Sequence, residues 1–559
     1  MTDLVLDPMK LIPDPDHAYG SWIGGQEYTV GRYVEVTNPA LGEPLARVQL
    51  GGTEVAEMAV VAARKAFATW SGLSYDDRGR YLIRFNRLLE RFQDAIATLI
   101  ALEQGKPITE ALAVELFSSA DTCRYLARHA AEDLAPQRHT YQNPLMAGKR
   151  GEVRYEPVGP VLIVTPWNLP FLIPATEVAQ ALAAGNTIVL RPSPVAPFSA
   201  LALQRLLERA GLPPGVVNTT LVTDETMYCL ARNRQIRRIS FFGGEGSGRR
   251  MMTAAAEALT PITLQMDGKD AAIVCADCDL ERTALGVAWW GLANAGQVSA
   301  GIQRVYVERP IARAFLERLA RIMMSLRMGD PLDPQTDIGP LTLSEQRDVV
   351  IGHVADAVAR GAKLLVGGEV PRGPGWFYPP TLLAGVDHSM PIMRQDTYGP
   401  VIPVMVVDSV DEAVALANDS EYGMAASVWT ENPVRARLIA RRLRVGSVGI
   451  NDHGTGYGEP QATFGGEGKS GIGRTHGRHG LIAMSRIKHV SEEYHARRPP
   501  WWFPYNNELR DYLKSAFGAV YRPGFGPKFD RVRHILSLKR FRRAVRIGSF
   551  LKRWRQIFD

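Results

Sequence analysis

The stretch NAGQVSAGIQRVYV, residues 294–307, decides how the rest of the chain is interpreted. It runs from a glycine-containing turn into the apolar segment IQRVYV, whose alternation of residue types predicts a strand. A loop that leads into a strand is a common place for a reactive side chain beside a cofactor. Ser299 occupies that position in the loop, so it is the first candidate for a functional residue.

Upstream of this loop, apolar runs of strand length alternate with helical segments. The helices VAQALAAG and LALQRLLERAG separate the strand-like runs VLIVTPW, NTIVLRPS, VVNTTLV and RRISFFGG. Buried strands that alternate with helices predict a parallel, doubly wound sheet. Such a sheet binds nucleotides at the carboxyl ends of its strands.

A second α/β block is expected over residues 268–450, with helices near 311–327 and 343–360. At the start of the chain, alternation over 20–50 predicts short antiparallel strands, and 53–70 predicts a helix capped by Thr53. Residues 77–135 continue with helical spacing, interrupted at EQGKP (103–107). The segments 137–156 and 479–493 are predicted to form strands outside both sheets.

Composition limits the class of protein. The chain has 559 residues and 46% apolar content, enough for two or three packed domains. Its four cysteines are too scattered for a disulfide framework, so we expect a reducing, cytoplasmic environment. Cys275 and Cys278 form a C-x-x-C without a second pair, and we expect no metal site. We expect neither a secretory leader nor an apolar run of about 18 residues that could cross a membrane.

The net charge of +7 is unevenly distributed. Residues 497–559 hold 16 Lys/Arg and 4 Asp/Glu, which is +12, so the remainder of the chain carries −5. A mildly acidic body therefore precedes a basic extension. Within it, residues 531–558 place aromatic and aliphatic side chains at helical spacings, with Arg and Lys between them. Such helices lie on anionic membranes or bind acidic proteins, although one could also dock on the body or on a second subunit.

Several sequence blocks resemble the aldehyde dehydrogenase superfamily. These blocks are NPALGEP, EQGKP, EPVGPVLIVTPWNLPF, ALAAGNTIVLRPS, GLPPGVVN, YGPVIPV, YGMAASVWT and FGGEGKSGIGR, and with them the resemblance covers about residues 20–493. It implies a Rossmann-type cofactor domain (1–136 and 157–267) and a catalytic-type α/β domain (268–450). It further implies an oligomerisation arm (137–156 and 479–493), ahead of the basic helical extension (497–559), and a homo-oligomer, either dimer or tetramer.

In the catalytic positions the chain departs from the pattern of that family. Ser299 stands where the family has its nucleophilic cysteine, and Gln265 stands where the family has its general base, a glutamate. Asn168 matches the asparagine that stabilises the oxyanion. An aliphatic hydroxyl needs an adjacent base to become a nucleophile, and an amide cannot deprotonate water.

The resemblance also implies NAD or NADP as cofactor, with several of its contacts altered. Arg191 and Pro194 replace a lysine and a glutamate on the adenosine ribose, and Gly244 replaces a serine at the pyrophosphate. Asp267 replaces a glycine, and Asp396 replaces the glutamate on the nicotinamide ribose. The implied cofactor-binding positions are Trp167, Arg191, Gly243, Gly244 and Asp396.

The sequence therefore predicts an aldehyde dehydrogenase-like α/β protein whose catalysis is impaired or lost, acting as a scaffold or regulatory subunit. Two alternatives remain open. One is an active NAD(P)-dependent aldehyde dehydrogenase, for example with its cysteine changed to Ser299 by engineering. The other is a weak esterase that uses Ser299. An anionic membrane or an acidic protein is the expected partner of the basic extension, and nucleic acid is not expected.

Overall fold

The computed structural model describes residues 11–141, 146, 149–493, 499 and 501–521. The described chain divides into two compact units: residues 1–134 with 156–486, and residues 135–155 with 487–559. The basic stretch 531–558 lies outside the described residues. In the described part of the chain, no helix is long and apolar enough to cross a membrane.

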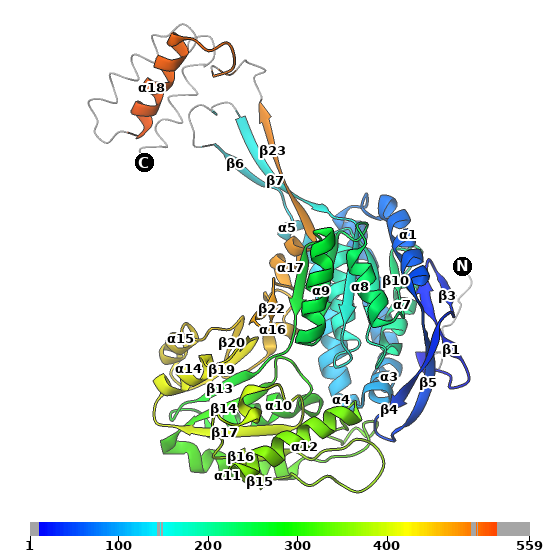
Figure 1. Cartoon of the computed structure of the whole chain (residues 1–559), viewed down its shortest axis with the longest axis vertical. Helices are drawn as coiled ribbons and strands as arrows, with labels where there is room; N and C mark the ends of the chain where they lie inside the picture. Colours follow the sequence, from blue (N-terminus) through cyan, green and yellow to red (C-terminus); the bar gives the residue numbers. More distant parts are fainter. Residues whose placement is uncertain (1–10, 142–145, 147–148, 494–498, 500, 522–559) are drawn as a thin grey trace. The chain divides into compact units, whose positions relative to one another are not determined.

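The first unit contains an eight-stranded sheet (Figure 1). Its five central strands are parallel, as the alternation of strands and helices predicts, while short antiparallel strands close both edges. In spatial order the strands are β22 (Gly471–Ile472), β12 (Ile262–Gln265), β11 (Arg238–Phe242), β8 (Pro160–Thr165), β9 (Thr187–Pro192), β10 (Val217–Thr219), β2 (Ser21–Ile23) and β3 (Gln26–Tyr28).

Helices pack on this sheet because its central strands are apolar on both faces. Side chains of β8, β9 and β11 share one buried cluster with α1, α8 and α9. Helix α6 is buried over its whole length. The helices of this sheet are α1 (Thr53–Trp70), α6 (Leu172–Ala183), α7 (Phe198–Arg209), α8 (Asp224–Arg232) and α9 (Glu245–Ala258).

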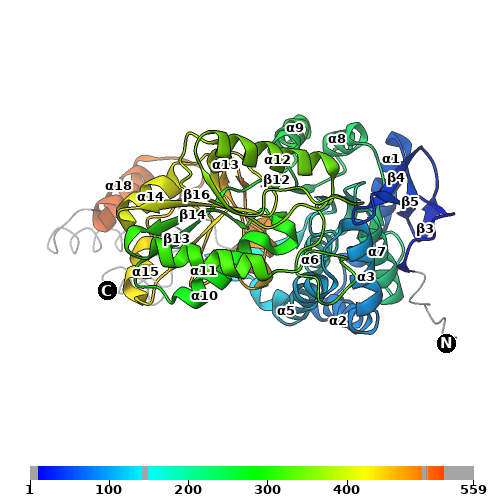
Figure 2. The same cartoon turned by 90° about the horizontal axis from the view of Figure 1, so that it is seen from below.

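The first unit also contains a second sheet of seven strands (Figure 2). All seven strands lie within residues 270–308 and 363–450. Only the edge strand β15 is antiparallel. The order is β15 (Lys363–Val366), β16 (Thr381–Ala384), β17 (Val401–Val407), β14 (Ile302–Glu308), β13 (Asp270–Val274), β19 (Ala425–Trp429) and β20 (Ser447–Ile450). The predicted strand IQRVYV is thus β14, at the centre of this sheet.

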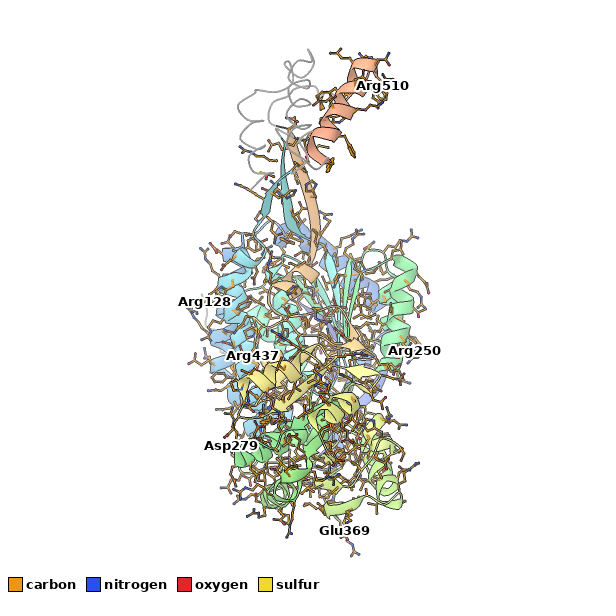
Figure 3. The ribbon with its side chains drawn as sticks, turned by 90° about the vertical axis from the view of Figure 1, so that its left-hand side faces the viewer. Arg128, Arg250, Asp279, Glu369, Arg437 and Arg510 are labelled. Carbon is orange, nitrogen blue, oxygen red and sulfur yellow. The ribbon has the colours of Figure 1, made fainter. Side chains whose placement is uncertain are left out.

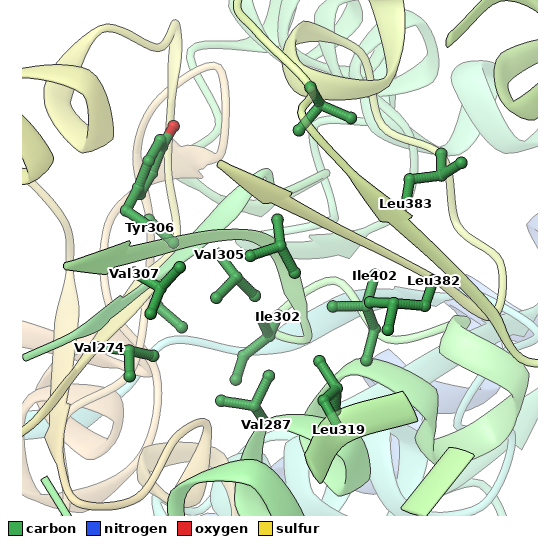
Figure 4. Close-up of a cluster of buried hydrophobic side chains, with 14 of the residues drawn as sticks. Val274, Val287, Ile302, Val305, Tyr306, Val307, Leu319, Leu382, Leu383 and Ile402 are labelled. Atoms are coloured by element: carbon green, nitrogen blue, oxygen red, sulfur yellow. The ribbon is translucent and has the colours of Figure 1, made fainter. Parts of the chain in front are cut away.

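Strand β14 is buried along its whole length, and this includes its polar residues Gln303, Arg304 and Glu308. Val305 and Val307 pack with Leu319 of α11 (Ala312–Ser325) and with Ile402 of β17 in one cluster (Figure 4). A rigid central strand fixes the loop that precedes it, and that loop carries Ser299.

The helical region after α1 also matches its prediction, including the interruption at EQGKP. Helix α3 (Gln93–Gln104) ends at Gly105, which has φ 88°, a left-handed conformation that favours glycine. The other elements are α2 (Tyr75–Arg91), α4 (Ile108–Glu110), the π-helix η2 (Ala111–Leu116) and α5 (Phe117–Asp133). Charged side chains such as Arg128 on α5 and Arg250 on α9 point outward from the ribbon (Figure 3).

Two local predictions were wrong. The N-cap of α1 is Gly52, and Thr53 is already its first helical residue, so no side chain caps this helix. The start of the predicted strand segment 479–493 is helical instead, as part of α17 (Gly477–Ala483). Its last turn bonds back to Gly480, and the strand β23 (Ser485–Glu493) begins only two residues later.

The second unit contains a three-stranded sheet in the order β23, β7 (Lys149–Pro157) and β6 (Gln137–Thr140). Most side chains of β6 and β23 are exposed. The same unit contains α18 (Asn507–Tyr521), with Phe517 and Tyr521 exposed. These strands lie outside the two larger sheets, as the sequence predicted.

Candidate active site

A cavity of about 700 Å³ lies in the first unit, where the carboxyl ends of β8, β11 and β12 face the loop before β14. Most of the predicted site residues line it, although they come from distant parts of the sequence. They are Trp167, Asn168, Gly243, Gly244, Gln265, Ser299 and Asp396. Arg191 is the one predicted site residue that does not line this cavity.

The loop that presents Ser299 has an unusual backbone. Asn294, Ala295 and Gly296 have φ values of 55°, 53° and 73°, three consecutive left-handed conformations. A side chain at Gly296 would lie 2.1 Å from the Gly399 carbonyl oxygen, so only glycine fits there. Gln297 holds the turn by donating to the Asn294 carbonyl (2.9 Å) and accepting from the Thr342 N–H (3.0 Å). Backbone conformation and side-chain hydrogen bonds therefore fix the loop that carries Ser299.

Ser299 itself is half-buried at the cavity wall. Among the described residues, its hydroxyl forms no side-chain hydrogen bond. No histidine, lysine or carboxylate of the described chain is thus placed to take its proton. A serine without a neighbouring base remains a neutral alcohol near neutral pH.

Asn168 lies in the loop after β8, with its side chain buried. Its Nδ2 donates to the Gln297 carbonyl at 3.1 Å, while Oδ1 has no partner among the described residues. The Asn168 carbonyl accepts from Asn294 Nδ2 (2.9 Å) and from Lys106 Nζ (3.1 Å). Asn168 therefore links the β8 loop to the Ser299 loop through both its side chain and its backbone.

Sequence reasoning assigned no role to Lys106, which belongs to EQGKP. Lys106 and Glu115 form a fully buried ion pair, and Glu115 Oε2 also accepts from the Phe171 and Leu172 N–H groups (2.8 and 2.9 Å). The carboxylate thus caps the start of α6, where the helix dipole favours negative charge. Because Lys106 also holds the Asn168 carbonyl, this pair fixes the loop that carries Asn168.

Gln265 is the last residue of β12 and is buried. Its Oε1 accepts from the Gly466 N–H at 3.2 Å, and its Nε2 has no partner among the described residues. A primary amide is uncharged at every pH relevant to proteins, so this position supplies no base.

Asp267 lies two residues after Gln265, and its side chain contacts the N-terminus of α9. Its Oδ2 accepts from the Glu245 N–H at 2.8 Å, and Gly244 is the N-cap of that helix. A side chain at Gly244 would lie 3.8 Å from both Asp267 carboxylate oxygens. Burial raises the pKa of Asp267, and the neighbouring Glu245 carboxylate adds to this rise. The N-terminus of α9 therefore already carries a carboxylate from the chain itself.

Asp396 lies at the same end of the cavity and accepts from Gln303 Nε2 at 2.7 Å. Gln303 in turn accepts from the buried amine Lys269 Nζ at 2.9 Å. Burial raises the pKa of Asp396 and lowers the pKa of Lys269, and each charge opposes the shift of the other. Lys269 and Gln303 were missed because only the folded chain connects them to Asp396 through hydrogen bonds.

Arg191 lies at the end of β9, 5% exposed. Its Nη2 binds Asp224 Oδ1 at 2.5 Å and the Val222 carbonyl at 3.2 Å. This guanidinium is therefore already paired within the protein. Asp224 opens α8, where its negative charge is also favoured by the helix dipole.

The comparisons with known proteins agree with this architecture. The aldehyde dehydrogenase family model matches residues 22–490. The chain belongs to the aldehyde dehydrogenase family. It is 35% identical to a betaine aldehyde dehydrogenase of Bacillus subtilis over 481 residues, 84% of this chain and 96% of that protein. A betaine aldehyde dehydrogenase of Cereibacter sphaeroides is 35% identical over 465 residues, 83% and 94% of the two chains.

Solved structures of the family superpose on most of the chain. A NAD-dependent aldehyde dehydrogenase from Sinorhizobium meliloti is 33% identical, with a TM-score of 0.83, covering 90% of this chain and 99% of the other. An aldehyde dehydrogenase of Bacillus cereus, solved as a NAD+ complex, is 30% identical with a TM-score of 0.82, covering 88% and 100%. The predicted family and fold class are thus confirmed.

By family membership the cofactor is NAD or NADP. The residues at the cofactor end nevertheless fit a dinucleotide poorly. The first turn of α9 holds the Asp267 carboxylate, Arg191 is paired with Asp224, and Pro194 offers no side-chain acceptor.

The C-x-x-C pair lies away from this cavity. Cys275 directly follows β13 and is buried, which raises the pKa of its thiol to about 12, and Cys278 is partly exposed. Both thiols remain free. Within the described residues, no cluster of His, Cys, Asp and Glu could hold a metal ion.

Proposed function

We propose that this chain is a catalytically impaired or inactive member of the aldehyde dehydrogenase family. The observation that supports this most directly is the isolation of the Ser299 hydroxyl, combined with a neutral amide at Gln265. In the family chemistry a cysteine attacks the aldehyde and a glutamate activates the water that releases the acid. Neither group has a replacement among the described neighbours of Ser299.

The loss of rate expected from a missing nucleophile is large and supports this proposal. Loss of the nucleophile in a serine protease costs on the order of 10⁶ in turnover, or roughly 8 kcal/mol of barrier. Asn168 cannot compensate, because an oxyanion donor stabilises charge only after a nucleophile has attacked. One N–H of its side-chain amide is also engaged with the Gln297 carbonyl.

We further propose a scaffold or regulatory role as a homo-oligomer, either a dimer or a tetramer, in the cytoplasm. The exposed strands β6 and β23 support this, since an uncovered sheet edge favours pairing with a second chain. The basic stretch 531–558 would then bring the oligomer to an anionic membrane or an acidic protein. Flotation with phosphatidylserine vesicles, compared with phosphatidylcholine vesicles, tests the first of these two partners.

The Ser299→Cys variant tests the proposal against its rival, a working enzyme whose cysteine has been replaced. We expect no turnover of aldehydes in this variant with NAD+ or NADP+, because the base at 265 and the cofactor contacts are still missing. Recovery of steady turnover by this single change would favour the rival and refute the proposal. Ser299→Ala is the matched control, since it also alters the side chain but adds no thiol.

A further inference from the structure

The first turn of α9 has the features of an anion-binding site, and a carboxylate of the protein itself already binds there. Glycines 243 and 244 lead into the helix, and nothing but Asp267 lies within 4 Å of a side chain placed at Gly244. Exposed N–H groups and the helix dipole make such a turn attractive to phosphate. Here the Asp267 carboxylate accepts from the Glu245 N–H at 2.8 Å, at the place where a phosphate oxygen would bind.

The charge of Asp267 is not neutralised by a neighbour. Its pKa is raised by burial and by Glu245, and no cationic side chain contributes to lowering it. Asp396 lines the same cavity. Burial raises the pKa of Tyr398, and the charges of Asp396 and Asp267 add to this rise. Lys269 donates to Gln303 and Thr397, and Gln303 in turn donates to Asp396. The Asp267 carboxyl therefore faces the start of α9 without a cationic partner among the described residues.

We propose that Asp267 is a specificity-determining residue that occupies the phosphate position of α9 and excludes dinucleotides from the cavity. The inference rests on the proposed function and deepens it, because it assigns the loss of cofactor to one side chain. A pyrophosphate would have to displace a bonded carboxylate and then remain beside it, and like charges at close range repel. Since the resembled family has glycine at this position, its helix start stays open.

A simpler explanation is that Asp267 only caps α9. An aspartate that bonds a first-turn N–H stabilises a helix whether or not a ligand competes for the site. The two explanations differ for Asp267→Asn, which keeps a capping oxygen but removes the charge. A purely structural cap predicts unchanged dinucleotide binding in this variant, whereas the exclusion model predicts stronger binding.

The experiment is a calorimetric titration of the full-length protein with NAD+ and with NADP+. We expect the dissociation constant to fall by about tenfold or more in Asp267→Gly, and by a smaller factor in Asp267→Asn. The matched control is Glu459→Gln, which removes one negative charge from an exposed residue that lines the same cavity but frees no helix N–H. We expect this control to change the dissociation constant by less than about twofold.

A second set of variants tests whether the other altered cofactor contacts mask the effect of Asp267. The same titrations are carried out with Pro194→Glu and Gly244→Ser, which return two side chains of the family pattern. Failure of Asp267→Gly to tighten binding in either background would overturn the proposal, as would tight dinucleotide binding by the wild type. Because binding is measured without an aldehyde, this failure is distinct from that of the proposed function, which depends on turnover.

Discussion

The side-chain amide of Asn168 donates its hydrogen bond to the backbone carbonyl of Gln297, 3.1 Å away. The donor that stabilises an oxyanion in the resembled family thus holds two loops together in this chain. The bond joins the loop after β8 to the loop before β14, and the Asn294 side chain reinforces it from the other side. This residue now has a structural role that does not require catalysis.

Replacing Asn168 by alanine should therefore destabilise the protein. The change removes a buried donor and leaves the Gln297 carbonyl with Asn294 Nδ2 alone, which should cost about 1–2 kcal/mol. Thermal unfolding followed by circular dichroism measures this loss of stability. A melting temperature equal to that of the wild type would show that the Asn168 bond does not join the loops.

Ser299→Ala should change neither stability nor hydrolysis. The hydroxyl has no partner among the described residues, so its removal should alter the free energy of unfolding by less than about 0.5 kcal/mol. Nitrophenyl ester hydrolysis should be the same in both proteins. A clear loss of esterase activity in the variant would instead support the alternative of a Ser299 hydrolase.

Lys106→Met should be the most destabilising of the single changes considered. It leaves the Glu115 carboxylate fully buried without its cation, and breaking a buried pair in this way costs about 3–5 kcal/mol. The control is Lys363→Met on the exposed strand β15, for which about 0.5 kcal/mol or less is expected. Similar melting temperatures for the two variants would contradict the assigned role of the buried pair.

Asp419→Asn should show a pH-dependent loss of stability. The Arg394 guanidinium and then His388 lower the pKa of Asp419 to about 2, below its usual value near 3.8. A lowered carboxylate pKa stabilises the folded state above the unfolded pKa, and the effect is lost as pH falls through the folded value. The difference in melting temperature between wild type and variant should thus be constant above about pH 5 and shrink toward pH 2. A difference that grows on acidification would be inconsistent with this pairing.

Much of the fold follows from local sequence patterns. The strand β14 and its neighbours were predictable because apolar runs of strand length alternate with helices, and Gly105 marked the end of α3. The segment at 479–483 was misassigned because the short apolar run Leu481–Ala483 is compatible with either a strand or a helix. It became the helix α17 through bonds to residues that local periodicity does not reveal.

The site was predictable only where the family motifs reach it. Ser299, Gln265 and Asn168 come from recognisable blocks, and all three line the cavity. The pairing of Lys106 with Glu115 and the bond from Glu245 to Asp267 depend on how separate elements approach in space. Sequence alone showed that Asp267 adds charge but did not show that the carboxylate caps α9.

The central claim is that this active site no longer oxidises aldehydes. The most direct measurement is dinucleotide reduction by the purified full-length wild type, with NAD+ and NADP+ and a panel of aliphatic, aromatic and trimethylammonium aldehydes. The account predicts no reduction above a protein-free control for any combination. Turnover at about 1–10³ s⁻¹, the ordinary range for enzymes, would contradict it.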